Sequence, residues 1–144
     1  MNAIHMTVGI GVIATNLIAG AWGGIAWLRK DPSVIFWYLL RTAQLVLVVQ
    51  VALGVILLAS GRQAADQIHL LYGILPLAVT LISEAMRAGA AQHELEGVGD
   101  LDALEEREQA VIARRVVLRE MGIMAVGTIL IVTIALRAYA VGSG

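Results

Sequence analysis

The chain of 144 residues contains no cysteine and only two prolines, and Asp, Glu, Lys and Arg together make up only 15% of it. Without cysteine the protein has no disulfides, thiolate nucleophiles or iron–sulfur clusters, and it cannot attach haem covalently through a Cys-x-x-Cys-His run. The net charge of −1 offers no basic surface for a polyanion, so we expect no nucleic-acid partner. The low content of charged residues and the high content of apolar residues also exclude a disordered chain.

Apolar residues make up 59% of the chain and gather into four long runs. A membrane-spanning helix needs about 20 mostly apolar residues. The runs cover about residues 3–28, 34–59, 68–86 and 121–141. The first run has no basic residue before it and exceeds the roughly 7–15 apolar residues of a signal peptide, so we expect it to be retained. The sequence therefore predicts an all-α integral membrane four-helix bundle, with residues 1–144 forming a single membrane domain.

The ten basic residues divide unequally between the two predicted membrane faces. Loops rich in Lys and Arg stay in the cytoplasm. Eight basic residues flank the first and third connections, against two, Arg62 and Arg137, on the other face: the eight are Arg29, Lys30, Arg41, Arg87, Arg107, Arg114, Arg115 and Arg119. We therefore predict a multi-pass protein of the plasma or inner membrane with both termini outside the cytoplasm.

The third connection, residues 87–119, is polar. Acidic residues follow Gly99, and either Asp100 or Asp102 is suited to cap a helix. No helix breaker follows before Gly122, and glycine is tolerated in membrane helices. The sequence thus predicts a fourth helix over 102–141 that begins in the cytoplasm. The cluster of Arg114, Arg115 and Arg119 either attracts anionic membrane lipid or simply anchors a solvated stalk.

Two histidines open the first and third helices within matching heptapeptides. Residues 4–10 and 68–74 both read Ile-His-x-x-x-Gly-Ile, at an offset of 64 residues. In the predicted topology both helices start on the same face, so His5 and His69 lie at the same depth and can converge. Each glycine, Gly9 or Gly73, lies one turn deeper on the same helix face and leaves space beneath the imidazole. Neutral imidazole is an axial ligand of haem iron, so the pattern predicts bis-histidine haem binding.

Further polar residues fit such a site. Arg62 and Arg137 lie at the same face and are suited to pair with the two haem propionates. Asp66 precedes His69 by three residues and is suited to accept a hydrogen bond from its second ring nitrogen. Each feature has a simpler interpretation, because interfacial histidines are often merely hydrated and arginines near helix ends extend to the headgroups.

Glu84 lies near the cytoplasmic end of the third predicted helix. An acid inside a membrane segment is a functional candidate. Arg87 follows one turn later, and Arg41 and Gln44 lie at the same face of the membrane. We therefore favour an interfacial ion pair of Glu84 with Arg87, with Arg41 and Gln44 able to join it across helices.

The stretch Gln50-Val51-Ala52-Leu53-Gly54, followed by Ile68-His69-Leu70-Leu71-Tyr72-Gly73, resembles one half of the haem A synthase family. In that family a helix with a Gln-x-x-x-Gly-like run precedes a helix that opens on a histidine, and His5-x-x-x-Gly9 matches the other histidine helix. The resemblance covers residues 3–86 and implies a bundle in which His5 and His69 hold a b-type haem near the outer surface. Haem A synthesis itself does not carry over, because this chain has four helices, not two such halves, and lacks the family's outer-loop acidic and cysteine features.

These observations predict a b-type cytochrome that transfers electrons near the outer face of the membrane. Two protein ligands fill both axial positions of the iron, which favours electron transfer over oxygen chemistry. A membrane quinone or a respiratory-complex subunit is the expected partner, and a homodimer could share the cofactor. The alternative is a non-catalytic accessory or assembly subunit of a larger membrane respiratory complex.

Other functions have less support in the sequence. An enzyme is disfavoured because there is no catalytic serine arrangement, no phosphate-binding glycine loop and no carboxylate pair within the membrane. A transporter is disfavoured by the lack of a pair of proline-broken helices. Copper or zinc held by His5 and His69 alone would be short of ligands, because a structural zinc site has four.

Overall fold

Four long helices follow the four apolar runs of the sequence. They are α1 (Asn2–Leu28), α2 (Val34–Ala59), α3 (Gln67–Leu95) and α4 (Glu106–Gly142), with a short 3₁₀ helix, η1 (Leu101–Ala103), before the last. The computed structural model describes residues 2–61 and 67–142. The described chain is an all-α four-helix bundle, and each of its four helices is long and apolar enough to cross a membrane.

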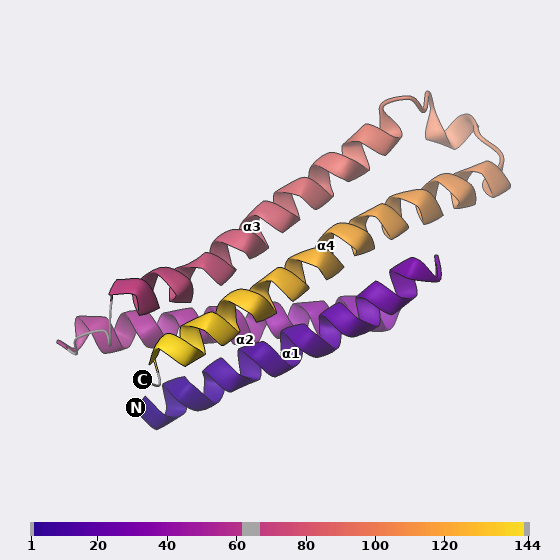
Figure 1. Ribbon diagram of the computed structural model, residues 1–144. Coiled ribbons are helices and arrows are strands. Elements are labelled where there is room, and N and C mark those ends of the chain that lie inside the picture. Colours follow the sequence, from indigo (N-terminus) through magenta and orange to yellow (C-terminus); the bar gives the residue numbers. More distant parts are fainter. Residues whose placement is uncertain (1, 62–66, 143–144) are drawn as a thin grey trace.

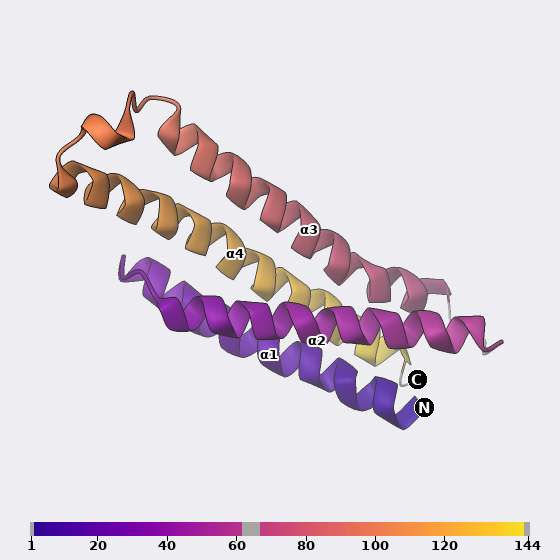
Figure 2. The ribbon, with the colours of Figure 1, turned by 180° about the vertical axis from the view of Figure 1, so that it is seen from behind.

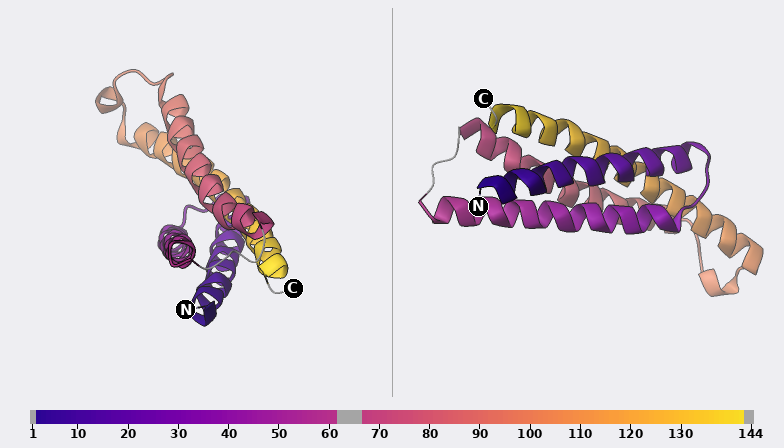
Figure 3. Two further views of the ribbon diagram at one scale, coloured as in Figure 1. Left: turned by 90° about the vertical axis from the view of Figure 1, so that its left-hand side faces the viewer. Right: turned by 90° about the horizontal axis from the view of Figure 1, so that it is seen from below.

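Consecutive helices run antiparallel, so the two ends of the chain lie at the same end of the bundle (Figure 1). We call this the terminal end, where α1 and α3 start and α2 and α4 finish; the opposite end is the hairpin end. Helix α4 packs along both α3 and α1, and α1 packs along α2, whereas α2 meets α3 over a short stretch only (Figure 3). Helix α4 is therefore the centre of the assembly.

The tight turn between α1 and α2 is fixed by local hydrogen bonds. Lys30 adopts a left-handed conformation with φ 56°, while the Lys30 and Asp31 amides donate to the carbonyls of Trp27 and Ala26. This is the Schellman arrangement that ends many helices. Ser33 then caps α2, because its hydroxyl accepts from the Phe36 amide at 3.3 Å.

Small residues allow α4 to approach both of its main neighbours. A Cβ placed on Gly20 of α1 would lie 2.6 Å from Cδ1 of Ile129, and one on Gly127 of α4 would lie 2.5 Å from Oγ of Ser83. Such close approach through small residues is the usual way that membrane helices associate. A buried cluster at the hairpin end fills the space between α2 and α4: Phe36, Leu40, Met121, Met124 and Ala125.

The outer surface of the bundle is apolar on all four helices. Large exposed side chains include Ile18, Val55, Leu81 and Leu130, one on each helix. Soluble proteins rarely expose such extensive apolar surface. The surface is therefore suited to lipid, as expected for a multi-pass membrane protein.

Helix α3 ends later than the sequence predicts, at Leu95 and not at residue 86. The prediction placed the end of the helix where the apolar run ends. The polar residues beyond it are also helical, and among them Glu94 forms ion pairs with Arg119 and Arg115 of α4. As a result, the α3–α4 hairpin extends well past the turn between α1 and α2 (Figure 2).

Helix α4 starts at Glu106, four residues after the predicted start at 102. Asp100 Oδ1 accepts from the Asp102 amide and so caps η1, and Leu104 then returns to an extended backbone. The side-chain amide of Gln109 donates to the carbonyls of Leu101 and Leu104. These bonds hold residues 101–104 apart from the regular helix.

Candidate functional site

The structure brings the two repeated histidines together at the terminal end of the bundle. His5 lies in the first turn of α1 and His69 in the first turn of α3. Their ring centroids are 6.4 Å apart, and the ring planes make an angle of 65°. Both side chains are half-buried. The convergence that the matching heptapeptides predict is therefore present.

Hydrogen bonds fix which ring nitrogen of each histidine carries the proton. Nδ1 of His69 lies 3.1 Å from the carbonyl oxygen of Ala138 on α4, and because a carbonyl only accepts, Nδ1–H must donate. The Gln50 side-chain amide donates from α2 to Nε2 of His5 at 3.2 Å, so this nitrogen accepts. In both rings Nε2 therefore carries the lone pair, the form in which imidazole binds metals.

Two buried polar atoms of the His5–Gln50 pair have no hydrogen-bond partner among the described residues. They are Nδ1 of His5 itself and Oε1 of Gln50. An unpaired buried donor or acceptor costs about 1–3 kcal/mol. A hydrogen-bond partner at either atom would therefore stabilise the folded protein.

The glycines near the histidines have different surroundings. A Cβ on Gly9 would lie 3.1 Å from Nε2 of Gln50, so the Gln50 amide fills the space predicted to lie open beneath His5. A Cβ on Gly54 would lie 3.4 Å from Cε1 of His5, whereas one on Gly73 would meet nothing within 4 Å. Gly73 thus lies at the exposed surface of α3, whereas the Gln50 side chain of α2 lies against Gly9.

Arg137 lies on α4, next in sequence to the residue that accepts from His69. It lines an open depression of about 570 Å³ with Tyr72 of α3. Arg62 and Asp66, the other two predicted partners of the site, lie outside the described residues. Among those that the structure describes, no group of three or more His, Asp or Glu side chains is placed to hold a metal ion.

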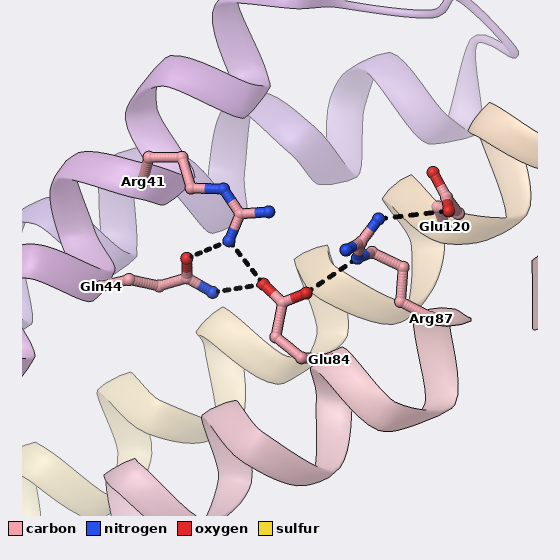
Figure 4. Close-up of polar contacts among 5 residues, drawn as sticks. All are labelled: Arg41, Gln44, Glu84, Arg87 and Glu120. Carbon is pink, nitrogen blue, oxygen red and sulfur yellow. Dashed lines mark hydrogen bonds and ion pairs between the residues drawn. The ribbon is translucent and has the colours of Figure 1, made fainter. Parts of the chain in front are cut away.

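A second polar cluster lies at the hairpin end (Figure 4): Arg41 and Gln44 of α2, Glu84 and Arg87 of α3, and Glu120 of α4. We call it the Glu84 network. Glu84 Oε1 accepts from Arg41 at 2.7 Å and from Gln44 at 2.8 Å, and its Oε2 accepts from Arg87 at 2.8 Å. The predicted pairing of Glu84 with Arg87, Arg41 and Gln44 is confirmed.

Glu120 is a member of this network that the sequence analysis missed. It accepts from Arg87 at 3.2 Å, and Arg87 also lies over the ring of Trp37, 5.8 Å from its centroid. Two arginines and two glutamates balance one another in charge. Because α2 otherwise contacts α3 so little, the network serves to hold α2 against the α3–α4 pair.

Comparisons with protein-family models, with curated proteins and with solved structures find no match to this chain. The resemblance to one half of haem A synthase therefore stays a prediction from the residues quoted above.

Proposed function

We propose that the chain is a membrane b-type cytochrome in which His5 and His69 are the axial ligands of one haem. The observation that carries the proposal is the approach of the two imidazoles, 6.4 Å between centroids, from two parallel helices. Haem b supplies a one-electron redox centre, and ligation by two histidines favours electron transfer over oxygen binding.

The distance between the rings supports this assignment. An imidazole nitrogen lies about 2 Å from a metal that it binds, and the ring centroid lies about 1 Å behind it, so two imidazoles on opposite sides of one ion have centroids about 6 Å apart. The observed 6.4 Å agrees with this value. The distance between the ring centroids is therefore compatible with one ion held by both imidazoles.

The hydrogen bonds around the rings support it as well. Metal-binding histidines usually donate through the second nitrogen to a carbonyl or carboxylate, which fixes the ring. His69 does so to Ala138. On His5, Gln50 donates to the nitrogen that a metal would use, so ligation replaces this one hydrogen bond and needs no change of tautomer.

The remaining residues would exclude water and balance charge. Helices α2 and α4 close the site through Gln50 and the Ala138 carbonyl. A propionate at the membrane surface would pair with Arg62, which lies outside the described residues, or with Arg137. By the distribution of basic residues the terminal end faces out of the cytoplasm, so electrons would pass to a quinone or a respiratory subunit near that face.

Optical spectra of the purified protein test the proposal. The chain is expressed with ample haem, purified in detergent, and examined as dithionite-reduced minus oxidised spectra. We expect about one haem per chain, and lower occupancy in His5→Ala and in His69→Ala. His93→Ala is the matched control, because His93 lies on α3 far from the site and contacts exposed Glu96. Absence of a haem band, or equal loss in all three variants, would contradict the proposal.

A second candidate is an accessory subunit of a larger membrane complex, favoured by the protruding α3–α4 hairpin. Acids at its tip, including Asp102, Glu105 and Glu106, form no ion pair within the described residues. Such a surface is available to a partner. Capture from native membranes of a stoichiometric partner without haem would favour this function over the first.

A further inference from the structure

Arg137 occupies an unusual position among the charged residues. In the described half of the bundle nearest the terminal end, residues 2–15, 46–61, 67–80 and 125–142, it is the only Asp, Glu, Lys or Arg. At the hairpin end, by contrast, Arg41, Arg87 and Arg119 each pair with a glutamate. Arg137 has no hydrogen bond or ion pair with any described residue.

The side chain nevertheless lines an open depression on the surface of α4, beside Tyr72 of α3. The depression measures about 570 Å³ and is lined by Tyr72, Thr133, Ile134, Leu136, Arg137 and Ala140. Its wall is mostly apolar, with a guanidinium and a phenol as its largest polar groups. Such a lining suits a ligand with an anionic head and an apolar body.

The position of Arg137 and Tyr72 along their helices indicates which class of ligand can reach them. Arg137 lies five residues before the last residue of α4, and Tyr72 five residues after the first residue of α3. At 1.5 Å per residue, both are about 7–8 Å inside the terminal end of the bundle. A lipid phosphate lies near this depth when the helices span a bilayer, with its acyl chains reaching toward the bundle centre.

We propose that this depression binds one anionic phospholipid of the leaflet at the terminal end. The guanidinium of Arg137 pairs with the phosphodiester, because arginine matches phosphate oxygens with two parallel N–H donors. Ile134 and Leu136 contact the acyl chains. The lipid supplies the counter-charge that Arg137 lacks among the described residues, and the proposal does not depend on haem binding.

Native mass spectrometry of the full chain released from detergent micelles tests this. Dioleoyl phosphatidylglycerol is the probe, dioleoyl glycerol tests the need for phosphate, and inorganic phosphate tests the need for acyl chains. We expect one phosphatidylglycerol adduct, with affinity about tenfold lower in Arg137→Gln, as the loss of a charge-assisted hydrogen bond implies. Thr133→Leu fills the depression without removing charge and should also lower affinity.

Arg107→Gln is the matched control, since Arg107 is also exposed but lies at the hairpin end. It should retain the adduct. Equal binding by wild type and Arg137→Gln, or equal binding of dioleoyl glycerol, would overturn the proposal. Displacement of the lipid by inorganic phosphate would show a simple oxyanion site. Displacement by haem would show that Arg137 serves a propionate, which would also overturn the lipid assignment.

Discussion

His5 and His69 are 64 positions apart in the sequence, yet their imidazole rings lie 6.4 Å apart between centroids. They come from two helices that run in the same direction, and each contacts a different neighbour, Gln50 on α2 and Ala138 on α4. All four helices thus contribute to one polar layer at the terminal end. The Glu84 network forms the second layer at the hairpin end, and between them the contacts are apolar or made through small residues.

The contact between Gln50 and His5 leads to a prediction about the role of Gln50. The amide either competes with iron for Nε2 of His5 or holds the imidazole in place for it. Gln50 donates to Nε2 of His5, the nitrogen that iron would take. Gln50→Ala removes this competitor, so we expect haem occupancy at or above that of wild type in a titration followed by absorbance. Loss of haem from Gln50→Ala would show that Gln50 positions His5, contrary to this account.

Removal of the Glu84 carboxylate should destabilise the bundle. Glu84→Ala leaves Arg41 and Arg87 without their shared anion and detaches α2 from α3. We expect a loss of about 1–3 kcal/mol in unfolding free energy, since charged hydrogen bonds are involved but the groups are part-exposed. Thermal unfolding in detergent measures the change. Glu96→Ala, whose carboxylate is exposed, is the control and should change stability little.

The close approach of α1 to α4 predicts opposite effects of one substitution at two glycines. Gly20→Ala places a methyl group 2.6 Å from Ile129 Cδ1 and 2.8 Å from Thr128 Oγ1, so it should cost about 1–3 kcal/mol. Gly24→Ala, one turn later, meets nothing within 4 Å and should be neutral or stabilising by up to about 1 kcal/mol. Unfolding midpoints of both variants in one detergent compare them. Equal midpoints would contradict the packing described for α1 and α4.

The orientation in the membrane can be tested with single cysteines, because the chain has none of its own. Ser60→Cys lies at the terminal end and Glu96→Cys at the hairpin end, and both native side chains are exposed. A membrane-impermeant maleimide should label Ser60→Cys in intact cells and Glu96→Cys only after permeabilisation. The reverse pattern would place both termini in the cytoplasm.

Much of the fold could be predicted from the sequence because the apolar runs are long and clearly bounded. The α1 and α2 bounds follow directly from them. The extension of α3 to Leu95 could not be predicted in this way, since it lies beyond the apolar run. Hydrophobicity marks where a helix can enter a membrane, not where its backbone hydrogen bonds end.

The candidate site was predictable to a similar degree. The matching heptapeptides predicted the histidine pair. The partners of Glu84 were predicted because Arg41, Gln44 and Arg87 are expected at the same depth in the membrane. The contact of His5 with Gln50 and that of Arg87 with Glu120 depend on how helices rotate about their axes. The rotation of each helix about its axis is set by packing among all four helices, and a short sequence motif does not predict it.

The central claim, that His5 and His69 jointly ligate one haem iron, is tested most directly by the spin state of the ferric protein. Electron paramagnetic resonance of the haem-loaded wild type should show a low-spin, six-coordinate centre. The haem that remains in His69→Ala should become high-spin and return to low-spin when imidazole is added. A high-spin wild type, or a low-spin signal unchanged in both His5→Ala and His69→Ala, would contradict the account.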